Sequence, residues 1–195
     1  MAELIIVGAG AAGLFAAGSA VRAGHRVTIL ERMASPGKKL LITGKGRCNV
    51  ANECEPDEFL KHVRRNPRFL FSSMAAMPPR RVMALFEREL GVPLKTERGR
   101  RVYPVSDRAQ DILDALLRYS QPSDICFGTQ AESLILENGR AAGIRTKDGR
   151  EFRGDAVLIA TGGVSYPTTG STGDGYRLAR QAGHTVIDPE PSLVS

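Results

Sequence analysis

Residues 4–31 read LIIVGAGAAGLFAAGSAVRAGHRVTILE, and this order of residue types predicts a strand, a turn, a helix and a second strand. The apolar run 4–7 is typical of a buried strand, and the run 14–23 is typical of a helix. Gly8, Gly10 and Gly13 lie between them in a Gly-x-Gly-x-x-Gly pattern. The second strand, 26–30, is followed by Glu31, 18 positions after the third glycine. Together these parts predict a βαβ unit that binds a dinucleotide.

Each part of this pattern has a physical role in holding such a ligand. Gly8 permits the tight turn out of the strand, Gly10 lets the backbone approach a pyrophosphate, and Gly13 lets the helix pack close to the sheet. The helix N-terminus offers unpaired N–H groups to the anion. Glu31 is placed to accept hydrogen bonds from a ribose diol. Its alternative interpretation is an ordinary exposed carboxylate at the end of a strand.

The same region has a second interpretation, because residues 4–21 carry no charge over 18 positions. An uncharged run of that length is also typical of a membrane helix or a signal peptide. However, Glu3 precedes it where a signal peptide would carry a positive charge, and four glycines interrupt it. We therefore expect no membrane segment.

The composition is that of an ordinary globular domain, with 195 residues, 42% hydrophobic and 25% charged. The cysteines are Cys48, Cys54 and Cys126, and no two form a Cys-x-x-Cys pair. This pattern argues against a disulfide framework, a zinc site and a dithiol redox pair, and the three histidines lack the spacing of metal ligands. We therefore expect a cytoplasmic protein without a metal site.

The formal charge is +6, and much of the basic excess lies between Lys38 and Arg101. Clustered Lys and Arg side chains are compatible with a nucleic-acid surface. They are equally compatible with a solvated face that attracts an anionic cofactor or substrate. No nucleic-acid-binding motif accompanies them, Trp is absent, and aromatic residues make up 6%. The prediction is a small-molecule substrate and no nucleic-acid partner.

The rest of the chain predicts a Gly- and Lys-rich loop over 32–52 and helical pieces over 56–90. A hairpin is expected over 92–105, and a helix capped by Ser106-Asp107 follows it. Strands at 125–127, 131–136, 141–146 and 151–152 are expected to form an antiparallel meander, because Asn138-Gly139 and Asp148-Gly149 are strong hairpin signals. A buried strand over 155–160 is expected to lead into a glycine-rich loop. The last predicted elements are a helix over 175–182 and a strand over 185–187.

Three further motifs, read together with this order of elements, identify a family. They are Gly44-Lys45-Gly46-Arg47-Cys48-Asn49-Val50-Ala51-Asn52, Arg101-Val102-Tyr103-Pro104 and Gly170-Ser171-Thr172-Gly173-Asp174-Gly175-Tyr176. The chain resembles the glutathione-reductase-like flavoproteins with two dinucleotide-binding domains. More narrowly it resembles the BaiN-like family of NAD(P)/FAD-dependent oxidoreductases, which is also called YhiN-like or aminoacetone-oxidase-type. The likeness runs from Leu4 to Pro191.

This resemblance implies an α/β fold: a Rossmann-like FAD-binding domain with a parallel sheet, an antiparallel meander and helices on both faces. It also implies contacts to FAD at particular positions. The turn residues Gly8, Gly10, Ala11, Ala12 and Gly13 would contact the pyrophosphate, and Glu31 would hold the adenosine ribose with Arg32 beside it. Ala131 would present backbone groups to adenine. The remaining implied contacts lie in three segments: Lys38, Lys39 and Leu40 against the cofactor; Thr43, Gly44, Arg47, Cys48 and Asn49 near the flavin; and Ala160, Thr161 and Gly162 over the dinucleotide.

Two positions depart from the family pattern, which usually has glycine at position 45 and threonine at position 51. Lys45 is compatible with the loop if its φ is negative. Family members are also considerably longer and continue into an inserted substrate domain and a returning strand. We therefore expect residues 1–195 to be the N-terminal portion of an FAD-binding domain, as a fragment or a naturally truncated product. The loss of a strand would leave an exposed sheet edge that favours self-association.

No residue is identified as catalytic, because in a flavoenzyme the redox chemistry belongs to the cofactor. Cys48 has two interpretations: a nucleophile whose pKa is lowered by Lys45 and Arg47, or a packing residue. Arg47 could steady an anionic flavin or pair with a carboxylate. Tyr103 and Tyr166 could stack near the flavin or anchor their loops, and Asp174 is expected to shape a helix start.

The sequence thus predicts an FAD-dependent oxidoreductase that acts on a small organic molecule, with NAD(P)H as electron donor. The alternative is a catalytically incomplete module that binds FAD or another nucleotide. Two further alternatives are a basic interaction protein that binds RNA or a membrane face, and a simple NAD dehydrogenase. The long loop and the meander disfavour the last of these.

Overall fold

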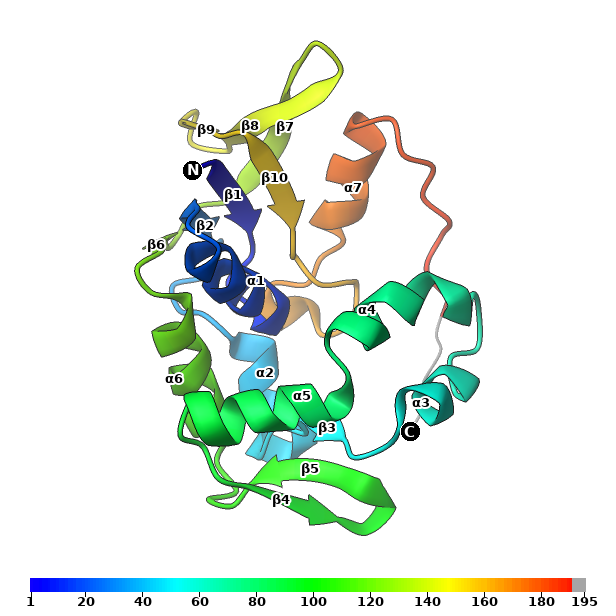
Figure 1. Cartoon of the computed structure of the whole chain (residues 1–195). Helices are drawn as coiled ribbons and strands as arrows, with labels where there is room; N and C mark the ends of the chain where they lie inside the picture. The colour runs from blue at the N-terminus through cyan, green and yellow to red at the C-terminus, as the bar shows by residue number, and fades with distance from the viewer. Residues whose placement is uncertain (191–195) are drawn as a thin grey trace. The chain divides into compact units, whose positions relative to one another are not determined.

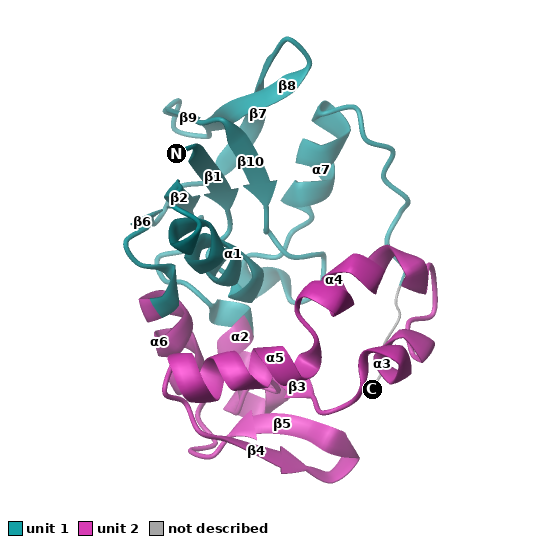
Figure 2. Cartoon of the chain, in the orientation of Figure 1, with its two compact units in different colours: residues 1–39, 119–195 teal, residues 40–118 magenta. Residues whose placement is uncertain are grey.

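The computed structural model describes residues 1–190 and divides the chain into two compact units (Figures 1 and 2). Unit 1 contains residues 1–39 and 119–195, and unit 2 contains residues 40–118. The division falls within two helices, α2 (Lys38–Ile42) and α6 (Ala109–Ser120). The assignment of residues 1–195 to one FAD-binding domain stays a prediction.

Unit 1 is built on a four-stranded parallel sheet with the strand order β10-β1-β2-β6. Its strands are β1 (Glu3–Val7), β2 (Arg26–Leu30), β6 (Asp124–Cys126) and β10 (Ala156–Ile159). Parallel strands covered on both faces are rich in apolar residues, as are Leu4–Val7 in β1 and Val27, Ile29 and Leu30 in β2. The βαβ unit and the strand over 155–160 are therefore confirmed.

The segment 125–127 was predicted as part of the meander, and this is wrong. Its strand β6 pairs in parallel with β2, with Ile125 opposite Ile29. Beyond the strands the pairing continues, because Thr129 donates its backbone N–H to the carbonyl of Glu31 at 2.8 Å. A three-residue strand shows too little alternation to distinguish a parallel from an antiparallel partner.

The two faces of this sheet are covered by different elements. On one face lies α1 (Ala11–Arg22), whose Leu14 and Ala17 are completely buried, as are Ile6 and Ile29. The opposite face packs on a core that includes Ile5, Val7, Leu30, Ala131, Ile144 and Leu178. Burying each large aliphatic side chain in such a core contributes about 1.5–3 kcal/mol. Ile5 and Ile6 thus face opposite sides, as the pleat of a strand requires.

The antiparallel meander consists of β7 (Ala131–Glu137), β8 (Arg140–Thr146) and β9 (Glu151–Arg153) in that order. Asn138 and Gly139 both have positive φ, 50° and 75°, which is the conformation of a tight two-residue hairpin turn. The meander predicted from residue 131 onward is confirmed. Its core includes Ile144 at 0% exposure.

The helix α7 (Asp174–Gln181) follows a loop that contains the 3-10 helix Pro167–Thr169. The strand predicted over 185–187 is wrong, since these residues have no regular structure and Ile187 is 81% exposed. The apolar pair Val186-Ile187 resembles a strand, but pairing needs a neighbouring strand edge, which no local pattern reports. The backbone N–H groups of Gly183 and His184 instead close the end of α7 by donating to Arg180 and Ala179.

Unit 2 combines short helices with a three-stranded antiparallel sheet of order β3-β5-β4. The strands are β3 (Ala51–Asn52), β4 (Leu94–Glu97) and β5 (Arg101–Pro104), so the hairpin predicted over 92–105 is confirmed. The helices are α3 (Pro56–Lys61), α4 (Phe71–Ala76) and α5 (Pro79–Ala84), with 3-10 turns at Thr43–Gly46, Pro67–Leu70 and Arg98–Arg100, and a π-helical turn at Leu85–Glu89. The helix α6 begins at Ala109, two positions after the predicted cap.

Within residues 1–190, none of the helices combines the length and the apolar character that crossing a bilayer requires. The uncharged run 4–21 is divided among β1, the turn 8–10 and all of α1 except its last residue, Arg22.

Candidate dinucleotide-binding site

In unit 1, three groups of predicted site residues follow the carboxyl ends of three adjacent parallel strands. The turn 8–13 follows β1, Glu31 follows β2, and residues 160–162 follow β10. Because β1 is flanked by β2 on one side and β10 on the other, all three groups lie at one edge of the sheet. Open α/β sheets bind their ligands at this edge, where the strand order reverses.

Two glycines of the turn are required by the packing of the protein itself. A Cβ on Gly8 would lie 2.5 Å from the carbonyl oxygen of Ala160, and φ at Gly8 is 110°. A Cβ on Gly13 would lie 1.9 Å from the carbonyl oxygen of Gly8. A side chain at either position therefore displaces backbone.

Gly10 is different, because a Cβ there would meet no protein atom within 4 Å. Its φ of −84° and ψ of −174° are open to any residue. Gly10 precedes α1, and no side chain caps this helix and no acidic residue lies in its first turn. Ala11 and Ala12 are exposed. The arrangement leaves the N-terminus of α1 without a side-chain cap, next to an open position at Gly10.

Glu31 is buried, with 8% exposure, and its carboxylate holds two backbone N–H groups. One oxygen accepts from Ala9 at 2.8 Å, and the other accepts from Met33 at 2.7 Å. The alternative of an ordinary exposed carboxylate is therefore wrong. Each oxygen can accept a further hydrogen bond, so the structure is compatible with the ribose role, which stays a prediction.

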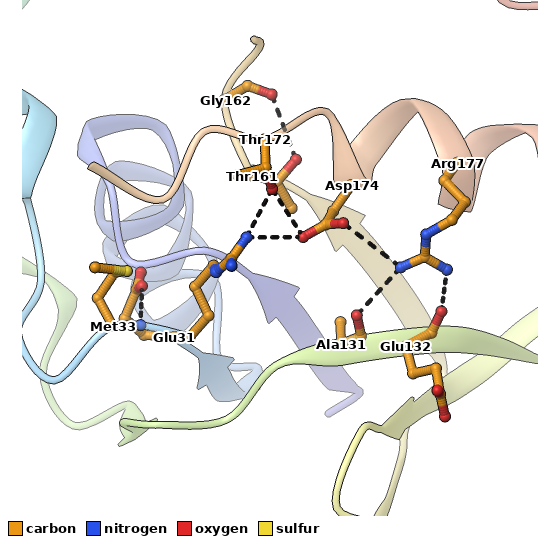
Figure 3. A network of polar contacts seen from close by, with 10 residues as sticks. Glu31, Met33, Ala131, Glu132, Thr161, Gly162, Thr172, Asp174 and Arg177 are labelled. Atoms are coloured by element: carbon orange, nitrogen blue, oxygen red, sulfur yellow. Dashed lines mark hydrogen bonds and ion pairs between the residues drawn. The ribbon is translucent and has the colours of Figure 1, made fainter. Parts of the chain in front are cut away.

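Arg32 points its guanidinium at the start of α7. Its Nη1 donates to the hydroxyl of Thr172 at 2.6 Å and pairs with the carboxylate of Asp174 at 3.1 Å. Figure 3 shows Asp174 between Thr172 and Arg177. The signal Thr172-Gly173-Asp174-Gly175 is visible in the sequence, and α7 does begin at Asp174, but the partnership with Arg32 is not visible. Met33 and Arg177 were missed altogether.

Ala131 is buried at the start of β7, and its carbonyl accepts from Arg177 at 3.3 Å. After β10, Ala160 donates its N–H to the carbonyl of Val7 at 2.8 Å. Gly162 has φ of 73°, and a Cβ there would lie 2.6 Å from the hydroxyl of Ser171. Thr161 lies before it with its hydroxyl 3.4 Å from the carbonyl of Gly162.

The two predicted lysines lie at the start of α2 and are half-buried. The ammonium of Lys39 donates to the carbonyl of Ser165 at 2.7 Å and contacts its hydroxyl at 3.2 Å. Lys39 therefore connects the first turn of α2 to the loop that follows β10 through hydrogen bonds to Ser165. Lys38 is the first residue of the same helix.

The remaining predicted residues belong to unit 2: Leu40 in α2, and Thr43, Gly44, Arg47, Cys48 and Asn49 in the loop 43–49. Leu40 is buried, and the hydroxyl of Thr43 donates to its carbonyl at 2.7 Å. Gly44 has φ of 56°, and a Cβ there would lie 2.9 Å from the ring of Tyr103. Asn49 is exposed, and in the orientation that satisfies its neighbours its amide nitrogen donates to the carbonyls of Ala51 and Val102.

Lys45 has φ of 60°, so the condition of a negative φ, under which lysine was predicted to suit the loop, is not met. This left-handed conformation favours glycine, which explains why a glycine suits the position. The loop accommodates lysine by leaving its side chain exposed.

Arg47 pairs with carboxylates, as one of its two interpretations required. Its Nη1 lies 2.9 Å from Glu97 and 3.4 Å from Asp107, and its guanidinium lies 4.1 Å from the ring centre of Tyr103. Tyr103 is buried, so it anchors this loop, whereas Tyr166 is 65% exposed.

Cys48 is buried at 6% exposure, and burial raises the pKa of its thiol, partly offset by a hydrogen bond with Thr43. The expectation that Lys45 and Arg47 lower this pKa is therefore wrong. A thiol in this state is a weak nucleophile, which favours the packing interpretation. Among residues 1–190, no group of three or more His, Cys, Asp or Glu side chains could hold a metal ion.

Comparison with known proteins connects this geometry to a family. The family described as HI0933-like protein Rossmann domain matches residues 2–190. The chain is similar to a 3-dehydro-bile acid delta(4,6)-reductase of Clostridium scindens, with 38% identity over 100% of this chain and 47% of the relative. It is also similar to a ribosomal RNA dihydrouridine synthase of Escherichia coli, with 31% identity over 98% of this chain and 47% of the relative.

The chain thus spans about half the length of these curated relatives. Among solved structures, Mycobacterium smegmatis Sdh1 in complex with UQ1 superposes with a TM-score of 0.66 at 20% identity, over 93% of this chain and 38% of that one. At this identity the likeness concerns the fold alone.

Proposed function

We propose, because the chain belongs to the HI0933-like Rossmann-domain family, that it binds FAD as the nucleotide-binding part of a flavin-dependent oxidoreductase. The turn 8–13 and the start of α1 would hold the diphosphate, and Glu31 would accept hydrogen bonds from the adenosine ribose. Bound FAD would supply the redox chemistry, and the protein would supply position and electrostatic environment.

The observation that carries this proposal is the contrast among the three glycines of the turn. The protein's own atoms account for Gly8 and Gly13, but a Cβ on Gly10 would meet no atom of a distant residue within 4 Å. The absent side chain at Gly10 is explained by a ligand that lies against the backbone, next to an uncapped helix N-terminus. A diphosphate has the charge and the size for this position.

The finer parts of the proposal concern the substrate and the electron donor. We propose a BaiN-like member that reduces or oxidises a small organic molecule with NAD(P)H as donor. The 38% identical relative, which is named a bile-acid reductase, supports a reductase. The alternative is a catalytically incomplete module that binds FAD. A cytoplasmic location stays a prediction from the cysteine pattern.

The first test is a titration of the purified chain with FAD, followed by flavin fluorescence, for the wild type and Gly10→Val. The backbone torsions at Gly10 admit valine, so the variant is expected to fold while its side chain occupies the space of the diphosphate. We expect at least about a hundredfold loss of affinity, as for a displaced charged contact. Ala23→Val, at the other end of α1, is the matched control and should bind like the wild type.

Circular dichroism of all three proteins shows whether the fold is retained. Equal FAD affinity of wild type and Gly10→Val would contradict the proposed site. Oxidation of NADH or NADPH, measured with and without added FAD, then separates an enzyme from a binding module. Turnover that requires FAD supports the enzyme, and tight FAD binding without turnover supports the module.

A second candidate function has support from charge. Unit 2 contains 15 Lys and Arg residues against 10 Asp and Glu residues, so it carries +5 of the formal charge of +6. The relative from Escherichia coli is named for its action on ribosomal RNA. An RNA substrate is therefore the alternative to a small molecule. Mobility-shift assays with ribosomal RNA over a range of salt concentrations test it, since phosphate contacts give a steep loss of affinity with salt.

Self-association through a sheet edge is also a proposal. Among the described residues, β10 and β6 are the edge strands of the parallel sheet. Sedimentation velocity at several protein concentrations measures it, and a monomer at all of them would contradict it.

A further inference from the structure

We propose that Asp174 and Thr172 make the site selective for adenosine nucleotides whose ribose 2′-hydroxyl is free, by holding Arg32 away from a 2′-phosphate. The inference rests on the proposed function, because it concerns the ribose end of the same site. It adds two specificity-determining residues that lie 140 and 142 positions away from Arg32 in the sequence.

The position of Arg32 is what raises the question of selectivity. It directly follows Glu31, the acid at the end of the second strand. In dinucleotide-binding sites, an acid at this place accepts hydrogen bonds from the ribose hydroxyls, whereas a nearby arginine accommodates a 2′-phosphate. Here both residue types occur side by side, so the partner of the arginine decides between the two ligands.

The structure provides that partner. The Nη1 of Arg32 donates to Thr172 at 2.6 Å and pairs with Asp174 at 3.1 Å. The side chains of Arg32 and Asp174 are 32% and 23% exposed, so solvent screens the pair only in part. Thr172 also lies 3.2 Å from the Asp174 carboxylate and donates to it in the geometry observed. The charge of Arg32 is therefore neutralised within the protein.

Asp174 is itself held in place by a second arginine. Its other oxygen lies 3.7 Å from Nη2 of Arg177. Arg177 in turn donates to the backbone carbonyls of Ala131 and Glu132 in β7 (Figure 3). The carboxylate that engages Arg32 is thus shared with Arg177, and the network ends on strand β7.

Because Arg32 is paired within the protein, the charged group left to interact with the ribose is the carboxylate of Glu31. Its carboxylate is buried and fixed by the N–H groups of Ala9 and Met33. Two hydroxyl groups can donate to this carboxylate, but a phosphate dianion is repelled by it. The site therefore favours ADP, and the adenosine end of FAD, over a 2′-phosphorylated nucleotide.

The experiment compares two ligands that differ only in the 2′-phosphate: ADP and 2′-phosphoadenosine 5′-diphosphate. Both are titrated into the full 195-residue chain by calorimetry at low and physiological salt. We expect the wild type to prefer ADP, and Asp174→Asn to shift the affinity ratio by about tenfold towards the 2′-phosphorylated ligand, as for one released charge-assisted contact. Adding Arg32→Ala to Asp174→Asn should abolish this shift.

The matched control is Glu137→Gln, which removes one negative charge from an exposed ion pair with Arg153 in the same unit and should leave the ratio unchanged. If Asp174→Asn does not fold, Thr172→Val, which removes a hydrogen bond and no charge, should give a smaller shift in the same direction. If the wild type binds ADP, and every folded variant has the wild-type ratio of affinities for ADP and the 2′-phosphorylated ligand, this inference is overturned and the proposed function stands. Failure of the wild type to bind ADP would overturn both.

Discussion

Glu31 accepts the backbone N–H of Ala9 at 2.8 Å, so the carboxylate at the end of β2 fixes the glycine-rich turn that follows β1. The same side chain accepts from Met33 at 2.7 Å and thereby also fixes the chain that leaves β2. A residue expected to serve a ligand is therefore also a structural part of the turn. Its two roles can be separated by measuring stability without ligand.

We predict that Glu31→Gln destabilises the ligand-free protein by about 1–3 kcal/mol, because the amide nitrogen cannot accept the hydrogen bond that one oxygen accepts, and a buried N–H loses its partner. Urea unfolding followed by circular dichroism measures this difference. Glu137→Gln, with an exposed side chain, is the control and should change stability little. Equal midpoints for the two variants would contradict the structural role of Glu31.

We predict that Gly13→Ala destabilises the protein by about 1–3 kcal/mol or more, because its Cβ would lie 1.9 Å from the carbonyl oxygen of Gly8. Gly10→Ala is the matched variant in the same turn and should unfold at the wild-type temperature, since the space around Gly10 is open. Thermal unfolding without nucleotide compares them. A stable Gly13→Ala protein would show that helix α1 does not approach the turn this closely.

Arg22 of α1 contacts Tyr119, and both residues belong to unit 1. The guanidinium of Arg22 lies 3.8 Å from the ring centre of Tyr119, and its Nη1 donates to the carbonyls of Gly18 and Tyr119. We predict that Arg22→Met costs about 1–3 kcal/mol of stability, because a thioether keeps the apolar length and loses both hydrogen bonds. Arg26→Met, which removes an exposed arginine that pairs with Glu3, is the control and should cost less. A similar loss of stability in both variants would argue against a stabilising contact between Arg22 and Tyr119.

Burial raises the pKa of the Cys48 thiol, so its thiolate forms only at a higher pH than that of an ordinary cysteine. We predict that iodoacetamide labels Cys126, which is half-buried, before Cys48 at neutral pH. The unfolded thiol ionises at lower pH than the folded one, so this contribution to stability is present below the unfolded pKa and lost as the pH rises through the folded pKa. Mass spectrometry of labelled peptides at several pH values tests the order, and labelling of Cys48 first would contradict it.

Local patterns were sufficient for the parts of the fold whose partners are close in sequence. The strand predicted over 4–7 and the helix predicted over 14–23 are present as β1 and α1, although α1 begins at Ala11, because the glycine spacing and the apolar runs encode them directly. The hairpins at Asn138-Gly139 and over 92–105 were also predicted, since a turn residue with positive φ defines its own two strands. The requirement for glycine at Gly8 and Gly13 likewise follows from the motif.

Residue types alone did not reveal the contacts between distant segments. Strand β6 pairs with β2, and Arg32 pairs with Asp174, although each pair of partners is far apart in sequence. The burial of Glu31 likewise depends on the surrounding tertiary structure. The strand expected over 185–187 failed for the same reason, because a strand exists only where a neighbour offers its backbone groups. Sequence patterns report the periodicity and torsional preferences of one segment. Which segments meet depends on the packing free energy of the whole unit. Only that packing brings the residues of the polar network at this site together.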